Sequence, residues 1–248
     1  MSRTSYHHGN LANALEDAAV ELARAGGPEA VVLREVARRA GVSPTAAYRH
    51  FASQRDLLER VKLRALAELA ERITTALTAL PAVGDPAEAA VARVLAAGRA
   101  YIDFARAEPG CFATAFRRTD DGEGGGGGGT GSGGEAGGGA RNGSGGRAGG
   151  GAGGGEADGG PLRYDGALLL LGSLLDELVA AGRMPAEARP HAEYAAWAAV
   201  HGVAVLLLDG PLRRQDTAAQ NAAVDRTLRL VIDGFTVGPT RSAGPAGE

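Results

Sequence analysis

Apolar residues recur every three or four positions along most of this 248-residue chain, and this spacing constrains the fold more than any other feature. It gathers apolar side chains on one stripe of an α-helix, whereas a half-buried strand needs strict alternation. Ala and Leu dominate the stripes, and aromatic residues make up only 4% of the chain. Because small side chains suit closely packed helices, the sequence predicts an all-α protein.

Capping residues indicate where the predicted helices of the first half begin. Asn10 is the expected N-cap of the first helix, and Ser43 followed by Pro44 supplies an N-cap and a first-turn proline. Val32 precedes the second helix and has no side chain that caps it. A short apolar turn is expected to follow the last helix of this half. The helices are expected over residues 10–25, 33–39, 44–51, 53–80 and 85–106.

A glycine-rich tract interrupts the pattern between residues 122 and 160, where 24 of 39 positions are glycine. Such a segment buries too little apolar surface to offset its ordering entropy, so it is predicted to be a disordered loop. Helices resume over residues 168–179, 192–208 and 216–235. The second of these is apolar all round, which predicts burial against its own domain and against a partner subunit.

Two short helices separated by Ala40, Gly41 and Val42 have the spacing of a helix-turn-helix. A small Ala37 lets the helices approach each other, and Gly41 can adopt the positive φ that the turn requires. The alternative is a helical corner in an unrelated bundle. The second helix is narrow enough for a major groove of about 12 Å. It is expected to expose Pro44, Thr45, Ala47, Tyr48, Arg49 and His50.

Charge is unevenly distributed along the chain. Residues 1–64 carry ten Lys/Arg against seven Asp/Glu, a net charge of +3, so the remainder carries −6 of the total of −3. His7, His8 and His50 also lie in this first part. Its surface potential is therefore expected to favour a polyanion, which the rest of the chain repels.

The run LREVARRAGVSPTAAYRHFASQRDLL, residues 33–58, resembles the TetR family of bacterial regulators, and with the first helix the resemblance covers roughly residues 6–64. The run WAAVHG, residues 197–202, is similar to the Trp-His-Gly signature of one class of C-terminal domains in that family. The resemblance implies a three-helix DNA-binding domain over residues 1–52. It also implies a helical ligand-binding and dimerisation domain over residues 53–248, which contains the loop at 122–160.

The resemblance implies DNA contacts position by position. Thr45 and Ala47 are expected to meet base edges or thymine methyls, and Tyr48 and His50 to donate to phosphates, although Tyr48 has the alternative of a core position. Gln54 stands where the family often has a phosphate-binding lysine, and Arg55 is the candidate replacement. An N-terminal arm that includes Tyr6 is expected to follow the backbone or enter a minor groove. The predicted DNA-contacting residues are Arg3, His7, His8, Arg34, Ser43, Pro44, Thr45, Ala47, Tyr48, His50 and Arg55.

A ligand pocket is predicted where the scarce aromatic residues gather near the central helices. Few charges occur in those segments, so an apolar or weakly polar ligand is expected. For His201 and Trp197 the alternative is a buried structural role, and for Cys111 a buried position is favoured over redox sensing. The predicted pocket walls are Phe104, Phe112, Phe116, Leu171, Leu174, Trp197 and His201.

No constellation in the sequence predicts catalysis. His191 and His201 lie ten residues apart without a Cys or carboxylate at metal-site spacing, and no nucleophile elbow occurs outside the glycine-rich tract. The sequence therefore predicts no enzyme activity, no cofactor and no metal. A single cysteine and the lack of an apolar run of roughly 20 residues predict a cytoplasmic protein without a membrane partner.

The predicted function is that of a homodimeric repressor that binds a palindromic operator in double-stranded DNA and is released by an unidentified small-molecule ligand. A ligand that favours a different spacing of the two recognition helices lowers operator affinity. The alternative is a helical ligand-binding or protein-interaction module without sequence-specific DNA binding. A helical enzyme is a more distant alternative.

Overall fold

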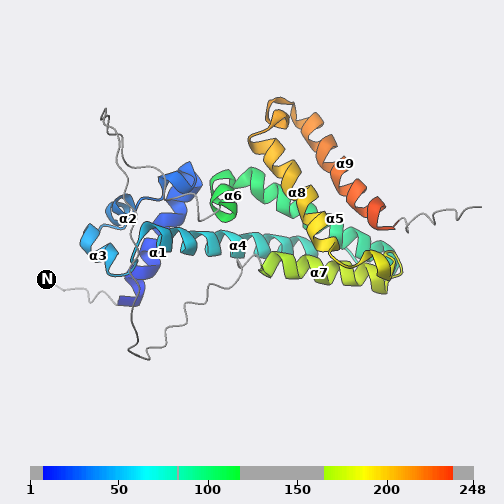
Figure 1. The fold of residues 1–248 in the computed structure, drawn as a ribbon, viewed down its shortest axis with the longest axis horizontal. Helices are drawn as coiled ribbons and strands as arrows, with labels where there is room; N and C mark the ends of the chain where they lie inside the picture. The colour runs from blue at the N-terminus through cyan, green and yellow to red at the C-terminus, as the bar shows by residue number, and fades with distance from the viewer. Residues whose placement is uncertain (1–7, 83, 118–164, 237–248) are drawn as a thin grey trace, which may run out of the picture. The chain divides into compact units, whose positions relative to one another are not determined.

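The structure is a computed structural model that describes residues 8–82, 84–117 and 165–236, and regular structure in these ranges is entirely helical (Figure 1). The all-α prediction is confirmed for this part of the chain, while the tract at 122–160 lies outside the described residues. All described residues belong to one compact unit. Its α-helices are α1 His8–Gly26, α2 Leu33–Arg39, α3 Pro44–Tyr48, α4 Gln54–Thr78, α5 Pro86–Ala107, α6 Pro109–Phe116, α7 Asp165–Ala180, α8 Ala192–Leu208 and α9 Thr217–Thr236.

The long helix α4 connects the front of the unit, formed by α1, α2 and α3, to the remaining helices. It packs against α1, α5, α6 and α7, so helices from both halves of the chain meet on it (Figure 1). The contact depends on an apolar stripe at helical spacing, which is buried along almost the whole helix. Its larger members are Leu57, Val61, Leu66, Leu69, Ile73 and Leu77.

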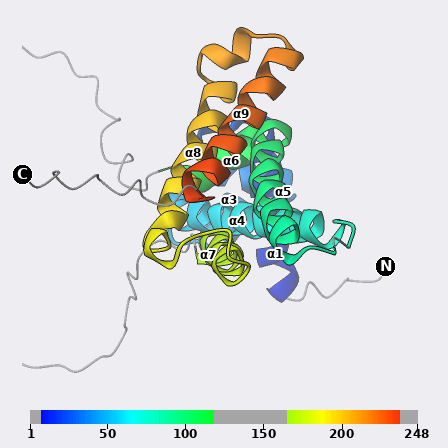
Figure 2. The same ribbon diagram turned by 90° about the vertical axis from the view of Figure 1, so that its right-hand side faces the viewer.

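Helices α8 and α9 lie side by side, and both pack on α5 (Figure 2). Helix α8 buries one face, which includes Val200 and Val203, while Val205 and Leu206 on other faces are exposed. Contact of its outer side with a partner therefore stays a prediction. Within the described ranges, no helix combines the length and apolar character needed to cross a membrane.

Serine and aspartate side chains cap four helices, including the Ser43 cap that the sequence predicts. Each side-chain oxygen accepts a backbone N–H bond within the first turn of its helix, which satisfies a donor that the helix leaves unpaired. The backbone amide of Ala46 donates to Ser43, that of Asp56 to Ser53, that of Ala87 to Asp85 and that of Ala219 to Asp216. As expected, Val32 provides no side-chain cap to α2.

Three predictions about the first half of the chain are wrong. Helix α1 begins at His8, so Asn10 lies inside the helix instead of capping it. Helix α3 ends at Tyr48, before Phe51, because the amides of the next two residues turn back to carbonyls three positions earlier. Residues 109–116, expected to be an apolar turn, form helix α6.

Cys111 is completely buried in α6, as the sequence favoured. Burial removes water from the thiolate form, and this desolvation raises the pKa of Cys111 to about 11. The thiol is therefore protonated at neutral pH and shielded from oxidants.

Gly41 in the turn between α2 and α3 has a φ of +71°, and a Cβ there would find nothing within 4 Å. Replacing Gly41 with alanine should therefore cost about 1 kcal/mol through backbone strain alone. Gly234→Ala is the matched control, since that site in α9 is also open but has ordinary helical φ. Urea unfolding of both variants checks this, and equal free energies of unfolding would contradict it.

Candidate functional site

Helices α2 and α3 form a tight helix-turn-helix at the front of the unit. The Val42 amide donates to the Ala37 carbonyl at 2.9 Å, which closes the turn. Ala37 is fully buried, and its small side chain allows the two helices to approach. Ser43 then starts α3 by accepting the Ala46 amide at 3.2 Å, so its hydroxyl is engaged as a helix cap.

The outer side of α3 is exposed to solvent. Pro44, Thr45 and Arg49 are exposed, and Tyr48 exposes 53% of its surface. The core alternative for Tyr48 is therefore wrong. His50 is partly exposed just after the helix. This face presents a hydroxyl, a phenol and a guanidinium, which are groups that can donate to base edges and phosphates.

Ala47 is a correction to the sequence prediction. It was expected on the exposed face as a contact to bases, but it has no exposed surface and belongs to the hydrophobic core. Because α3 is only five residues long, one side must pack inward, and Ala47 occupies that side. Its side chain is therefore not available to DNA in this conformation.

The helices that precede and follow α3 in the chain carry exposed arginines. Arg34 on α2 and Arg55 on α4 are exposed and form no ion pair with any residue in the described ranges. Arg38, by contrast, is paired with Glu35 one turn earlier on α2. The predicted contacts Arg3 and His7 lie outside the described residues, as does the side chain of His8.

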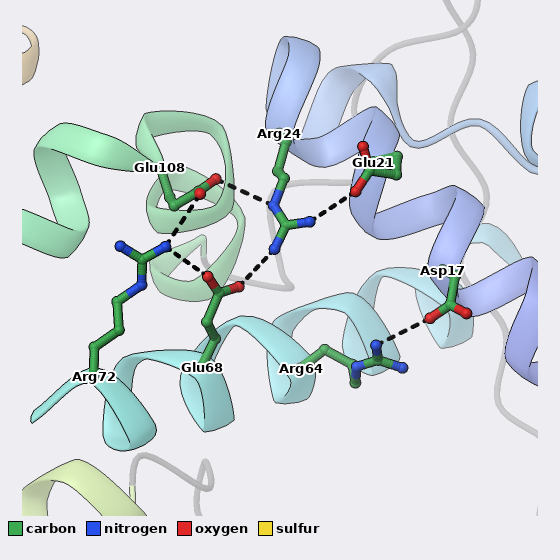
Figure 3. Close-up of polar contacts among 7 residues, drawn as sticks. All are labelled: Asp17, Glu21, Arg24, Arg64, Glu68, Arg72 and Glu108. Atoms are coloured by element: carbon green, nitrogen blue, oxygen red, sulfur yellow. Dashed lines mark hydrogen bonds and ion pairs between the residues drawn. The ribbon is translucent and has the colours of Figure 1, made fainter. Parts of the chain in front are cut away.

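A network of ion pairs joins α1 to α4 and to the start of α6 (Figure 3). Arg24 on α1 contacts Glu21 at 2.7 Å, Glu68 at 2.8 Å and Glu108 at 3.2 Å. Arg72 on α4 contacts Glu68 at 2.8 Å and Glu108 at 3.2 Å. The two guanidinium groups thus share the carboxylates of Glu68 and Glu108, while Glu21 pairs with Arg24 alone in the part of the chain that the structure describes, and Glu108 is the N-cap residue of α6.

Burial raises the pKa of Glu68, but the hydrogen bonds from Arg72 and Arg24 outweigh it and hold the pKa below the ordinary value of 4.5. The charged form of Glu68 is therefore favoured in the folded state. A network of this kind contributes more than an isolated surface pair, because four of its five charged groups have more than one partner.

Gly110 places α6 directly against α1. A Cβ at this position would lie 2.0 Å from the carbonyl oxygen of Ala23, so only glycine permits the contact. The first turn of α6 therefore lies on the last carbonyl groups of α1, beside the Arg24 network. Because the two helices touch backbone to backbone, a shift of α6 has little room to occur without moving α1.

An apolar cavity lies behind α6, between α4, α5, α7 and α8. Its volume is about 60 Å³, well below the 300 Å³ or more that is usual for a ligand site, so a ligand of ordinary size would have to widen it. Four of the predicted pocket residues line it. They are Phe116, Leu171, Leu174 and Trp197.

An aromatic cluster adjoins this cavity. The rings of Phe112 and His201 are stacked with centroids 5.4 Å apart, and Phe116 lies 4.9 Å from His201. Tyr101 connects the cluster through hydrogen bonds, since its hydroxyl lies 2.8 Å from Nδ1 of His201 and accepts Nε1–H of Trp197 at 3.2 Å. Burial lowers the pKa of His201, which favours the neutral imidazole.

Phe104 was predicted as a pocket wall, but it lies on another side of α5. It is completely buried, and the guanidinium of Arg72 lies 5.4 Å from the centroid of its ring. It does not line the apolar cavity. Phe104 therefore packs against the ion-pair network on α4 rather than against the apolar cavity.

Sequence reasoning missed Tyr101 and the Arg24 network. Tyr101 had one available signal, because it is one of few aromatic residues and occupies the apolar stripe of α5. The pair of Arg24 and Glu108 is separated by 84 residues and carries no local pattern. Within the described ranges, no group of three or more potential metal ligands occurs.

Two sequence families match the chain. Bacterial regulatory proteins of the TetR family match residues 15–61, which include α2 and α3, and the tetracyclin repressor-like C-terminal domain matches residues 163–231. The chain belongs to the TetR family. It is a DNA-binding transcription regulator built from a helix-turn-helix and a helical C-terminal domain.

Solved structures share this TetR-family fold. A Rhodococcus sp. RHA1 protein of unknown function has a TM-score of 0.64 at 20% identity, covering 95% of this chain and 100% of its own. A proposed TetR-family regulator from Shewanella sp. PV-4 has a TM-score of 0.56 at 16% identity, covering 92% and 99%. Another proposed TetR-family regulator, from Mesorhizobium loti, has a TM-score of 0.51 at 13% identity, covering 94% of this chain and 100% of its own. No curated protein matches the sequence.

Replacing Glu68 with glutamine should lower the free energy of unfolding at pH 7 by roughly 1 kcal/mol, because Arg24 and Arg72 lose a shared carboxylate. The stabilisation that the charged Glu68 gives to the native protein is present above the ordinary pKa of 4.5. It is lost as the pH falls below that value and through the folded-state pKa, which is lowered. Urea unfolding between pH 3 and pH 7 measures this difference.

Glu71→Gln is the matched control, because Glu71 is exposed on the same helix and forms no ion pair in the described structure. It should change stability little at any pH. A pH-independent difference between Glu68→Gln and the native protein would show that the ion pairs do not stabilise the fold.

Proposed function

We propose that this regulator is a homodimeric repressor that binds a near-palindromic operator through α3 and is released by a small molecule. The observation that carries the proposal is the exposed face of α3, where Thr45 and Tyr48 stand clear of the core, together with the exposed Arg34 and Arg55 on the helices that precede and follow it in the chain. A short helix with this surface suits base readout by its small side chains and phosphate contacts by its flanks.

The remaining predicted DNA contacts enter the proposal on different grounds. Ser43, Pro44 and His50 are placed beside the exposed face, whereas Ala47 is excluded by its burial. Arg3, His7 and His8 are proposed as an arm along the duplex on the basis of sequence alone. Together they give a footprint centred on Thr45 and Tyr48.

A second copy of the chain is proposed to pack against the outer sides of α8 and α9. Apolar side chains are exposed there, with Leu206 at 43% and Leu230 at 56%. Ala195, Ala198 and Gly202 on α8 are small and at least partly exposed, which allows close approach of another helix. A two-fold dimer would present two copies of α3, as a palindromic operator requires.

The ligand is proposed to enter the region of Phe112, Phe116, Trp197 and His201. Because α6 also touches α1 through Gly110 and Glu108, widening of this region would move the front of the unit. A ligand that favours the widened arrangement would then lower operator affinity by population shift.

Selection of genomic fragments by the full-length protein tests DNA recognition. The expected result is enrichment of one near-palindromic sequence. Thr45→Ala should relax preference at one position in each half-site, at a cost of about 1–3 kcal/mol, because a base contact is lost. Tyr48→Phe should weaken all sites alike by about threefold to tenfold, because only a phosphate hydrogen bond is lost. Thr75→Ala, exposed on α4, is the matched control.

If the chain is instead a module without sequence-specific DNA binding, none of these proteins should enrich any DNA sequence. An unchanged preference in Thr45→Ala would also reject this residue as a base contact. Mapping the selected site relative to a promoter separates repression from activation.

Salt dependence tests the flanking arginines. Arg34→Gln and Arg55→Gln should each reduce the slope of log affinity against log salt concentration by about two, since a dimer loses two phosphate contacts. Arg38→Gln should leave the slope nearly unchanged, because Arg38 is already paired with Glu35. Fluorescence anisotropy with the selected duplex at several salt concentrations measures these slopes, and equal slopes for all three variants would contradict the assignment.

A further inference from the structure

Arg49 is an exposed residue at the C-terminal end of α3 that the DNA contacts proposed above leave unused. Its backbone continues the helical turn, with a φ of −75° and a ψ of −21°, and its amide donates to the Ala46 carbonyl at 3.3 Å. The helical repeat therefore determines the direction in which the Arg49 side chain leaves the backbone.

The buried side of α3 shows which residues point away from the core. Ala47 is fully buried and Phe51 exposes only 3% of its surface, so the core lies on their side. Successive residues of a helix turn by about 100°, so Thr45 and Arg49 each point roughly 160° away from Ala47. These two residues lie one turn apart and form the ridge farthest from the core. Tyr48 follows Ala47 directly, so it lies on a flank of the helix.

The ridge is the part of α3 that base edges would meet. A recognition helix in the major groove turns its outermost side to the floor of the groove and its flanks to the phosphates. Thr45 and Arg49 therefore occupy base-reading positions, and Tyr48 occupies a phosphate-contacting one. This division agrees with the roles proposed above for Thr45 and Tyr48, and it adds Arg49 to the base-reading side.

The guanidinium of Arg49 is available to a base. Arg49 forms no ion pair and no side-chain hydrogen bond with any residue in the described ranges. Residues 40–55, which include the turn and α3, contain no Asp or Glu, so no carboxylate close in sequence competes for it. Arg38 differs, because it is paired with Glu35 on α2. Binding of a base to Arg49 therefore breaks no ion pair of the described structure.

Guanine is the base that a guanidinium matches best in the major groove. Its O6 and N7 are neighbouring acceptors, and the planar guanidinium presents N–H donors in a fork that can meet both. Adenine and cytosine each present an amine donor there, and arginine has no acceptor for it. Thymine offers a single acceptor beside its methyl group. An arginine on the ridge therefore discriminates in favour of guanine.

We propose that Arg49 is a specificity-determining residue that reads one guanine in each operator half-site through O6 and N7. The inference rests on the proposed function, because it names a base that the same face of α3 recognises. Thr45 and Arg49 are about 6 Å apart along the helix, and neighbouring base pairs are about 3.4 Å apart. The guanine therefore lies within about two base pairs of the position that Thr45 reads.

Selection of DNA sequences by the full-length protein and its variants tests this assignment. The native protein should select a guanine at one position of each half-site. Arg49→Ala should lose the preference at that position and keep the rest of the operator, whereas Thr45→Ala should relax a neighbouring position. Arg183→Ala is the matched control, because it makes the same change at an exposed site after α7 and should keep every preference.

A modified base identifies the contact at the level of one atom. In 7-deazaguanine a carbon replaces N7, which removes one acceptor and leaves base pairing intact. Anisotropy titration should show the native protein binding a duplex with this base in both half-sites about tenfold or more weakly than the unmodified duplex, because charged hydrogen bonds are lost. Arg49→Ala should bind the two duplexes equally. Its urea unfolding should match that of the native protein, because the side chain is exposed.

Three results would overturn the inference: an operator without a selected guanine, a guanine preference that survives in Arg49→Ala, or the same loss from 7-deazaguanine in the native protein and in Arg49→Ala. An Arg49→Ala protein that binds all sequences equally more weakly would assign Arg49 to a phosphate and would also reject it. Any of these results with an enriched operator leaves the proposed function in place. If the native protein enriches no sequence, the proposed function fails and this inference fails with it.

Discussion

Burial of one apolar stripe on α4 is the constraint on which the arrangement of the other helices depends. This helix of 25 residues meets α1 and α6 as well as α5 and α7, and most of its stripe is buried. Apolar burial is non-directional, so it brings these helices together without fixing their detailed register. The polar network and the tight glycine contact on the same helices then select one register among those that packing allows.

Helix α6 lies between the first helix of the chain and the aromatic cluster, and it contacts both. Its N-cap residue Glu108 joins the arginine network, and its eight residues place Gly110 against the backbone of α1 and Phe112 and Phe116 in the aromatic cluster. A short helix held at both ends moves as a rigid body more readily than it bends. Helix α1 and the aromatic cluster around His201 are thus connected by a single element.

Local features of the fold were predictable because their causes are local. Ser43, Ser53, Asp85 and Asp216 cap helices through bonds to residues only two or three positions away, and such bonds can be inferred from short sequence patterns. Gly41 was predictable for the same reason, since the turn between two short helices required a positive φ.

The errors arose where tertiary packing decides the outcome. Ala47 and Phe104 each lie on a helix whose periodicity permits more than one inward face, and the neighbouring helices determined which face was buried. The contacts of Arg24 with Glu108 and of Tyr101 with His201 join residues that are 84 and 100 positions apart. No spacing rule that is applied to a single sequence predicts contacts between residues so far apart.

The burial of Cys111 has a practical consequence for studying this regulator. Since the thiol is enclosed and protonated at neutral pH, maleimide and nitroxide reagents should bypass it in the folded protein. One cysteine introduced on the outer surface of α3 would then be labelled selectively without first removing the natural one. Spectroscopic distance measurements between two such labels would report the separation of the two α3 helices in a dimer.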